Sequence, residues 1–130
     1  MTAPRIFWLV ASLLMVPLTA GATGASGMQQ LNGNWARDDG STRIDIAPCG
    51  ADYCAVNTWV KNPNGKEHVG DKLILTLQPA SAAVLKGQAY DVRRKMHFSM
   101  TITLQATSMH TSGCVLLGIV CKNASWTRIN

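Results

Sequence analysis

The chain has 130 residues, of which 47% are hydrophobic and 15% charged, with 4 cysteines and a formal net charge of +5. This length is typical of a single domain. The modest numbers of glycine and proline exclude a collagen-like chain, and the low charge excludes a coiled coil or a strongly disordered chain.

The N-terminus is predicted to be a secretory signal peptide over residues 1–22. Arg5 precedes an apolar run over 6–18, and the small residues of 20–22 form a cleavage site. Because the run is shorter than the ~20 apolar residues of a membrane span, we expect a signal helix that is removed and leaves no transmembrane anchor. The protein would then be exported, either periplasmic or secreted. Small and polar residues over 23–32 predict a flexible segment, and residues 33–130 would form the domain.

The mature chain has the short alternating segments and tight turns of a β protein. Asp38-Asp39-Gly40 is a hairpin turn signal, and Asn62-Pro63-Asn64-Gly65 is the strongest turn signal of the chain. No segment after the leader shows a sustained helical period. The predicted strands cover 33–37, 42–47, 55–60, 72–78, 84–92, 96–104, the two arms of a hairpin over 114–121, and 126–129.

These elements predict an all-β fold of about eight strands. Consecutive short strands joined by tight turns favour an antiparallel up-and-down arrangement, and closing it into a barrel removes the exposed edges of an open sheet. A β-sandwich is the alternative. The cleanest alternation places one apolar face on a single strand, and this face would either pack as core or line a cavity for a small apolar or amphipathic ligand. Its members are Met96, Phe98, Met100, Ile102 and Leu104.

The cysteines predict two disulfides, because all four lie in the exported part and exported proteins meet an oxidising environment. Four cysteines allow three pairings. Hairpin geometry favours Cys49 with Cys54 and Cys114 with Cys121, since a two-residue turn at Leu117-Gly118 would place the second pair directly opposite. The chain-entropy model favours longer links. The spacings match neither a zinc site nor a redox motif.

Charge and motif content argue against several functions. The one basic cluster, Arg93-Arg94-Lys95, is too short for a nucleic-acid reader, and it is either a solvated turn or a contact with an anionic surface. The chain lacks a Gly-x-Ser-x-Gly nucleophile motif and a histidine metal motif. We therefore expect a protein that is not an enzyme, with no cofactor, no metal and no nucleic-acid partner.

A series of motifs resembles the bacterial family called domain of unknown function 2147. The series runs through Gly33-x-Trp35, Asp39-Gly40, Ile46-x-Pro48-Cys49-Gly50, Cys54, Gly87-x-x-Tyr90, Gly113-Cys114, Cys121 and Trp126-Thr127-Arg128. The resemblance covers about residues 31–129 and implies a small exported, lipocalin-like β-barrel with no established activity. The sequence departs from the family pattern over residues 90–94.

The chain also resembles lipocalins, in which a tryptophan of the first strand meets a basic residue of the last strand. Trp35 and Arg128 occupy these positions, so they are expected to close the barrel by a cation–π contact. Two functions follow. The first is a binding protein for a small apolar or amphipathic ligand in the cell envelope. The alternative is an envelope structural or protein-interaction module with a filled core.

Overall fold

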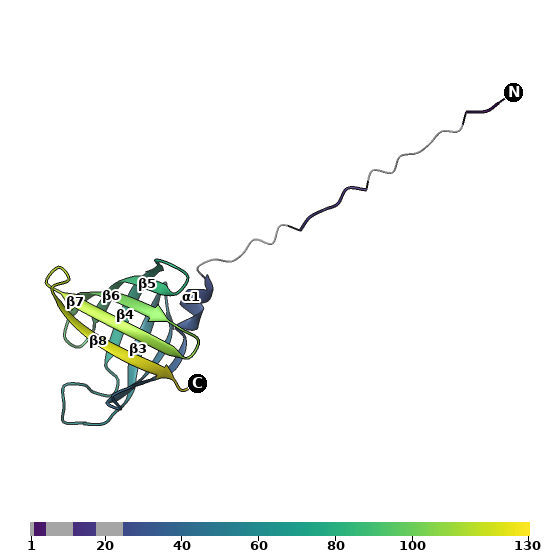
Figure 1. Ribbon diagram of the computed structural model, residues 1–130. Helices are drawn as coiled ribbons and strands as arrows, with labels where there is room; N and C mark the ends of the chain where they lie inside the picture. The colour runs from purple at the N-terminus through teal and green to yellow at the C-terminus, as the bar shows by residue number, and fades with distance from the viewer. Residues whose placement is uncertain (1, 5–11, 18–24) are drawn as a thin grey trace.

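Residues 33–128 form a closed antiparallel β-barrel in the computed structural model, which describes residues 2–4, 12–17 and 25–130 (Figure 1). Each strand pairs with the next one along the chain, and β1 pairs with β8 to close the barrel. The predicted up-and-down barrel is therefore confirmed, and the sandwich alternative is wrong. The strands are β1 (Gly33–Arg37), β2 (Thr42–Cys49), β3 (Asp52–Val60), β4 (Lys72–Pro79), β5 (Val84–Asp91), β6 (Met96–Leu104), β7 (Ser108–Val115) and β8 (Val120–Arg128).

The barrel has two different ends. The closed end carries the C-terminus, helix α1 (Ala25–Gln30) and the short connections 50–51, 80–83 and 105–107. The open end carries the connections 38–41, 61–71, 92–95 and 116–119. Because the strands alternate in direction, every second connection falls at the same end.

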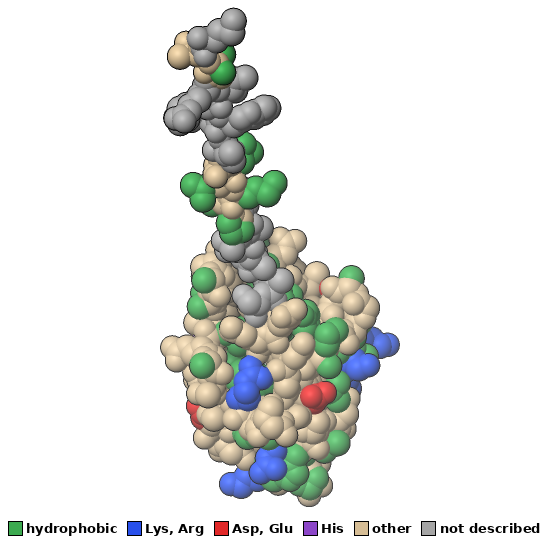
Figure 2. All heavy atoms as spheres, turned by 90° about the vertical axis from the view of Figure 1, so that its right-hand side faces the viewer, with side chains coloured by type: hydrophobic (Ala, Val, Ile, Leu, Met, Phe, Trp, Pro, Cys, Tyr) green, Lys and Arg blue, Asp and Glu red, His purple; other side chains and the backbone are tan. Residues whose placement is uncertain are grey.

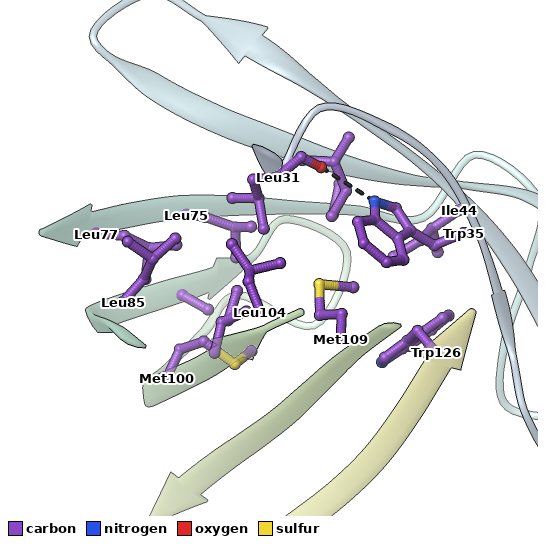
Figure 3. Packing of buried hydrophobic residues seen from close by; sticks show 14 residues of the cluster. Leu31, Trp35, Ile44, Leu75, Leu77, Leu85, Met100, Leu104, Met109 and Trp126 are labelled. Atoms are coloured by element: carbon purple, nitrogen blue, oxygen red, sulfur yellow. Dashed lines mark hydrogen bonds between the residues drawn. The ribbon is translucent and has the colours of Figure 1, made fainter. Parts of the chain in front are cut away.

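Side chains from all eight strands meet inside the barrel (Figure 3). In an eight-stranded barrel the interior is just wide enough for side chains, and the alternating pattern of each strand supplies them. The space between the strands is thus occupied by the protein's own apolar groups. The buried cluster consists of Leu31, Trp35, Ile44, Ile46, Ala55, Leu75, Leu77, Leu85, Ala89, Met100, Ile102, Leu104, Met109 and Trp126.

The segment before the barrel is ordered from residue 25 onward, whereas a flexible segment was predicted over 23–32. Helix α1 contacts β4 and β5, and Leu31 is fully buried in the core. The indole Nε1 of Trp35 donates a hydrogen bond to the carbonyl of Leu31 at 3.0 Å. Among the small and polar residues of this segment, two apolar anchors, Met28 and Leu31, are three residues apart and both pack on the core. The predicted signal peptide falls mostly outside the described residues.

Both disulfides have the pairing that hairpin geometry favoured. Cys49–Cys54 joins β2 to β3 with the Cα atoms 5.7 Å apart, and Cys114–Cys121 joins β7 to β8 with the Cα atoms 4.0 Å apart. Cys114 lies directly opposite Cys121 in the strand register. One boundary differs from the prediction, because the second arm of this hairpin and the predicted strand 126–129 form one continuous strand, β8. Two such disulfides suggest an oxidising, extracellular environment.

Candidate functional site

Trp35 and Arg128 lie opposite each other where β1 pairs with β8. The guanidinium carbon of Arg128 is 4.2 Å from the centre of the Trp35 ring, within the range of cation–π attraction. The same guanidinium donates hydrogen bonds to the carbonyls of Asn32, at 2.6 Å, and Gln30. Because these contacts occupy both side chains, the pair joins the first strand to the last and holds α1 in place.

The apolar face of β6 divides between the core and the open end. Met100, Ile102 and Leu104 belong to the buried cluster, and Phe98 is partly buried against it. Met96, the first residue of the strand, is 46% exposed at the open end. Four members of the proposed ligand-facing set are therefore packed against other side chains of the protein, and the fifth, Met96, lies partly exposed at the rim of the open end.

The basic cluster on the β5–β6 turn is clamped to the long β3–β4 connection. Arg93 donates to both carboxylate oxygens of Asp71, at 2.7 and 3.0 Å, and Arg94 donates to the buried Asp91 at 2.8 Å. Both guanidinium groups also donate to the carbonyl of Lys66, at 2.6 and 2.9 Å. The two arginines thus serve mainly to connect two loops of the open end.

Lys95 is the member of this cluster that stays available for a partner. Its side chain is exposed and makes no hydrogen bond or ion pair with the described residues. From the sequence, the three basic residues were interpreted together, as either a solvated turn or a contact with an anionic surface. The structure separates them, because two neutralise carboxylates of the same molecule and one faces solvent.

The ion pair between Arg93 and Asp71 predicts an acid-sensitive contribution to stability. Hydrogen bonds from Arg93 hold the pKa of Asp71 below its ordinary value of 3.8. The contribution is therefore fully present above about pH 4 and is lost as the pH falls through the lowered pKa. The free energy of unfolding of the wild type should fall when the pH is lowered from neutral to about pH 2. In the Asp71→Asn variant, which lacks this carboxylate, the fall should be smaller. Urea unfolding at both pH values measures this, and an equally steep loss in the variant would contradict it.

An open cleft of about 470 Å³ lies beside this ion pair. Its lining contains no serine, threonine or cysteine, so it lacks a hydroxyl or thiol nucleophile. The carboxylate in the lining, that of Asp71, forms an ion pair with Arg93. The cleft therefore lies at the junction of the β3–β4 and β5–β6 connections. The lining residues are His68, Val69, Gly70, Asp71, Lys72, Val92 and Arg93.

A different feature of the open end stands out, namely a group of exposed aliphatic side chains at the end of the β7–β8 hairpin. Leu117 is fully exposed, and Ile119 and Leu116 are 81% and 69% exposed. With the half-exposed Val120 they form what we call the apolar tip. The hairpin projects from the barrel at the end away from α1 (Figure 1). Contiguous apolar groups in such a position mark interaction sites more often than isolated ones.

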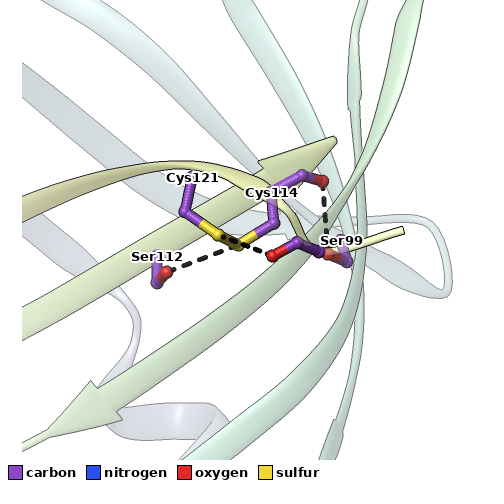
Figure 4. The surroundings of a disulfide bond; sticks show 5 residues. Ser99, Ser112, Cys114 and Cys121 are labelled. Atoms are coloured by element: carbon purple, nitrogen blue, oxygen red, sulfur yellow. Dashed lines mark hydrogen bonds between the residues drawn. A yellow bond between two sulfur atoms is a disulfide. The ribbon is translucent and has the colours of Figure 1, made fainter. Parts of the chain in front are cut away.

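The apolar tip is held firmly at its base. The Cys114–Cys121 disulfide crosses the hairpin just below the tip (Figure 4). Ser99 on the neighbouring strand β6 donates a hydrogen bond from its hydroxyl to the carbonyl of Cys114 at 3.2 Å. These links restrict the motion of the hairpin, so the aliphatic groups are presented on a rigid support.

The turn of the apolar tip places leucines in a backbone conformation that is unfavourable for them. The amide of Ile119 donates to the carbonyl of Leu116 at 3.2 Å, so Leu117 and Gly118 are the central residues, as predicted. Both have positive φ angles, 58° and 85°, which is the φ pattern of a type I′ turn and favours Asn-Gly. Leu116 also has a positive φ, of 53°. A leucine in this region costs about 1–2 kcal/mol, and full exposure gives Leu117 no compensating burial.

Leu117→Asn is therefore expected to raise the free energy of unfolding by about 1 kcal/mol. Asparagine tolerates the left-handed region, and Asn-Gly is the preferred pair at this turn. Urea unfolding of the two proteins provides the measurement. A variant less stable than the wild type would show that Leu117 supports the fold, and that its exposure has no functional meaning.

The net charge of the barrel is concentrated in its open half. Nine basic and five acidic residues lie in the open-end connections or near them on the strands, which leaves +4, whereas Lys86 and Arg128 balance Asp45 and Asp52 elsewhere. Seen from the closed end, Lys and Arg side chains form small separate groups near the centre, at the right edge and at the lower edge (Figure 2). The residues of the open half are Arg37, Arg43, Lys61, Lys66, Lys72, Arg93, Arg94, Lys95 and Lys122, with Asp38, Asp39, Glu67, Asp71 and Asp91.

Sequence reasoning identified the hairpin over 114–121 but assigned no function to it. The signal was present, because a disulfide across a tight hairpin forces the residues between the cysteines into solvent. An aliphatic run at that place has no core to join. The alternating strand 96–104 drew attention instead, although its apolar face belongs mainly to the core.

Comparisons with known proteins agree with this barrel. A redesigned β-barrel of solved structure is similar, with a TM-score of 0.50 and 13% identity over 80% of this chain and 95% of that chain. At this identity the likeness shows the fold alone. No curated protein matches the chain. Within the described residues, no helix has the length and apolar character needed to cross a membrane. A family model described as an uncharacterized protein conserved in bacteria matches residues 33–128, and the chain therefore belongs to this family, DUF2147.

Proposed function

We propose that this protein is an exported interaction module that carries out no catalysis and contacts a component of the bacterial envelope through its open end. The observation that carries the proposal is the apolar tip, because Leu117 is fully exposed in a backbone conformation unfavourable for leucine. A side chain that lowers the stability of the fold without joining the core has its use outside the fold. The barrel acts as the rigid support.

The packing of the interior favours this function over the storage of a small ligand inside the barrel. A ligand inside the barrel would have to contact Met100 and Ile102. These two residues of β6 belong to one buried cluster with residues from all of the remaining strands. A ligand would have to displace these contacts, and core side chains resist displacement because interiors are densely packed. Export is supported by the two disulfides and by the predicted leader.

Sedimentation with envelope fragments tests the proposal. The protein purified from its host is mixed with envelope fragments of that host, and the wild type should sediment with them. Leu117→Asn should remain largely in solution, whereas Ile129→Asn, a matched change of an exposed aliphatic residue at the closed end, should sediment like the wild type. Equal sedimentation of both variants would contradict the proposal.

Native mass spectrometry of the same preparation tests the alternative. An interaction module with a filled core should show the mass of the chain alone. A retained small molecule, removed by substitution of Met100, would identify a ligand-binding protein and overturn the proposal.

A further inference from the structure

We propose that the apolar tip inserts into an anionic lipid surface, with its aliphatic side chains among the acyl chains and neighbouring lysines at the headgroups. This inference rests on the proposed function and names the component that the open end contacts. It is argued from the chemistry of the tip, the position of nearby cations and the orientation of the barrel.

The chemistry of the tip suits a lipid better than a protein. Its side chains, from Leu116, Leu117, Ile119 and Val120, carry no hydrogen-bond donor or acceptor. Protein interfaces surround an apolar centre with about one hydrogen bond per 100–200 Å², whereas acyl chains require none. The tip is also convex and projects beyond the barrel (Figure 1). A short apolar projection on a rigid base can enter the boundary between headgroups and acyl chains.

Two lysines are placed to meet lipid headgroups around the tip. Lys122 follows the tip on β8, two residues beyond Val120. Lys95 lies on the β5–β6 turn at the same end of the barrel, and the pairing of β6 with β7 ends at Ser99 opposite Cys114. Neither lysine makes an ion pair with the described residues. A lysine near an anionic surface contributes attraction that adds to the burial of apolar groups.

The larger charge distribution orients the molecule in the same direction. The open half carries an excess of +4, while the charges of the rest of the barrel cancel. An anionic surface therefore attracts the end that carries the apolar tip. Helix α1 and the C-terminus lie at the closed end, away from the tip (Figure 1). Arg93 and Arg94 keep their carboxylate partners, so the surface does not have to break these pairs.

Flotation with lipid vesicles tests the inference, using the protein as its host processes it. Wild type should float with vesicles of phosphatidylcholine and phosphatidylglycerol and much less with phosphatidylcholine alone. Leu117→Asn should reduce the partition coefficient about tenfold, as expected when the burial of one leucine side chain is lost. Ile129→Asn should float like the wild type. Absence of flotation, or equal flotation of the two variants, would overturn the inference.

A second pair of variants tests the lysines. Lys95→Gln combined with Lys122→Gln should weaken flotation with the anionic vesicles about tenfold or more and should have little effect with neutral vesicles. Lys86→Gln, at the closed half, provides the control. An equal effect per charge removed in the control and in the double variant would show that only net charge matters, which overturns the assigned headgroup contacts.

The failure of the lipid inference can be distinguished from failure of the proposed function. If envelope fragments retain the protein through Leu117 but lipid vesicles do not, the tip binds an envelope protein and only the lipid inference is overturned. If sedimentation velocity detects a dimer that Leu117→Asn dissociates, the tip binds a second copy of the chain. That result overturns the lipid inference as well.

Discussion

Replacement of Trp35 by alanine is expected to lower the free energy of unfolding by about 3–5 kcal/mol, the usual cost of deleting a fully buried tryptophan. The side chain is fully buried, and its ring packs under the guanidinium of Arg128. Its Nε1 also holds the carbonyl of Leu31, which the variant would leave without this donor. The substitution therefore weakens the closure of the barrel and the attachment of α1 together. Urea unfolding followed by circular dichroism gives the measurement.

Trp59 provides the matched control for this prediction. It is 41% exposed near the end of β3, and its ring lies 5.1 Å from the guanidinium carbon of Arg43. The same kind of cation–π contact is thus present without the burial. Trp59→Ala should cost less than about 1 kcal/mol. Equal losses in the two variants would contradict the assignment of Trp35 to barrel closure.

Gly87→Ala is expected to be the other strongly destabilising change, at about 3 kcal/mol. A Cβ atom at this position would lie 2.0 Å from the backbone oxygen of Thr76 and 3.0 Å from the Cα of Leu77. Both atoms belong to the backbone of β4, which pairs with β5 here. The added methyl group can be accommodated only if the two strands move apart. Thermal and urea unfolding of the variant measure the cost.

Gly113→Ala is the matched control. Its Cβ atom would approach the ring of Phe98 to 2.9 Å, but this ring is only partly buried and can rotate away. We expect a loss of about 1 kcal/mol. A loss as large as that of Gly87→Ala would show that side-chain crowding in the barrel, rather than the approach of β4 to β5, limits both positions.

The barrel was predictable from the sequence because its rules are local. Alternation along 96–104 and the turn signals at Gly40 and 62–65 each act over a few residues, and a meander repeats them from one strand to the next. The hairpin disulfides were favoured for the same reason. Cys114 and Cys121 are close in the chain, so strand geometry alone decides their distance.

The ordered segment over 25–32 was not predictable in this way. Its two apolar anchors, Met28 and Leu31, can be buried only once the closed barrel provides an apolar end against which they pack. The clamp between Arg93 and Asp71 has the same origin, since residues far apart in sequence meet only after β3, β4 and β5 have paired. From the sequence alone Arg93 has no visible partner, whereas in the folded protein it forms an ion pair with Asp71.

The candidate site shows a different case, in which the hairpin closed by Cys114 and Cys121 was a sequence signal for exposure that composition alone does not reveal. Apolar residues between two cysteines resemble core when composition alone is considered. The φ angles of Leu116 and Leu117, together with their exposure, show that this run does not contribute to the core. The sequence had assigned these side chains only to a hairpin, and we now propose them as the contact surface.

Contact with a partner is expected at the open end, while the interior of the barrel stays closed. The four methionines of residues 25–130 can report on it, because Met100 and Met109 lie in the core, Met96 at the open end, and Met28 near the closed end. Methyl NMR spectra of methionine-labelled protein are recorded with and without envelope fragments of the host. We predict that the Met96 signal shifts or broadens while those of Met100 and Met109 keep their positions. A response of Met100 and Met109 with an unchanged Met96 would contradict the account and place the binding site inside the barrel.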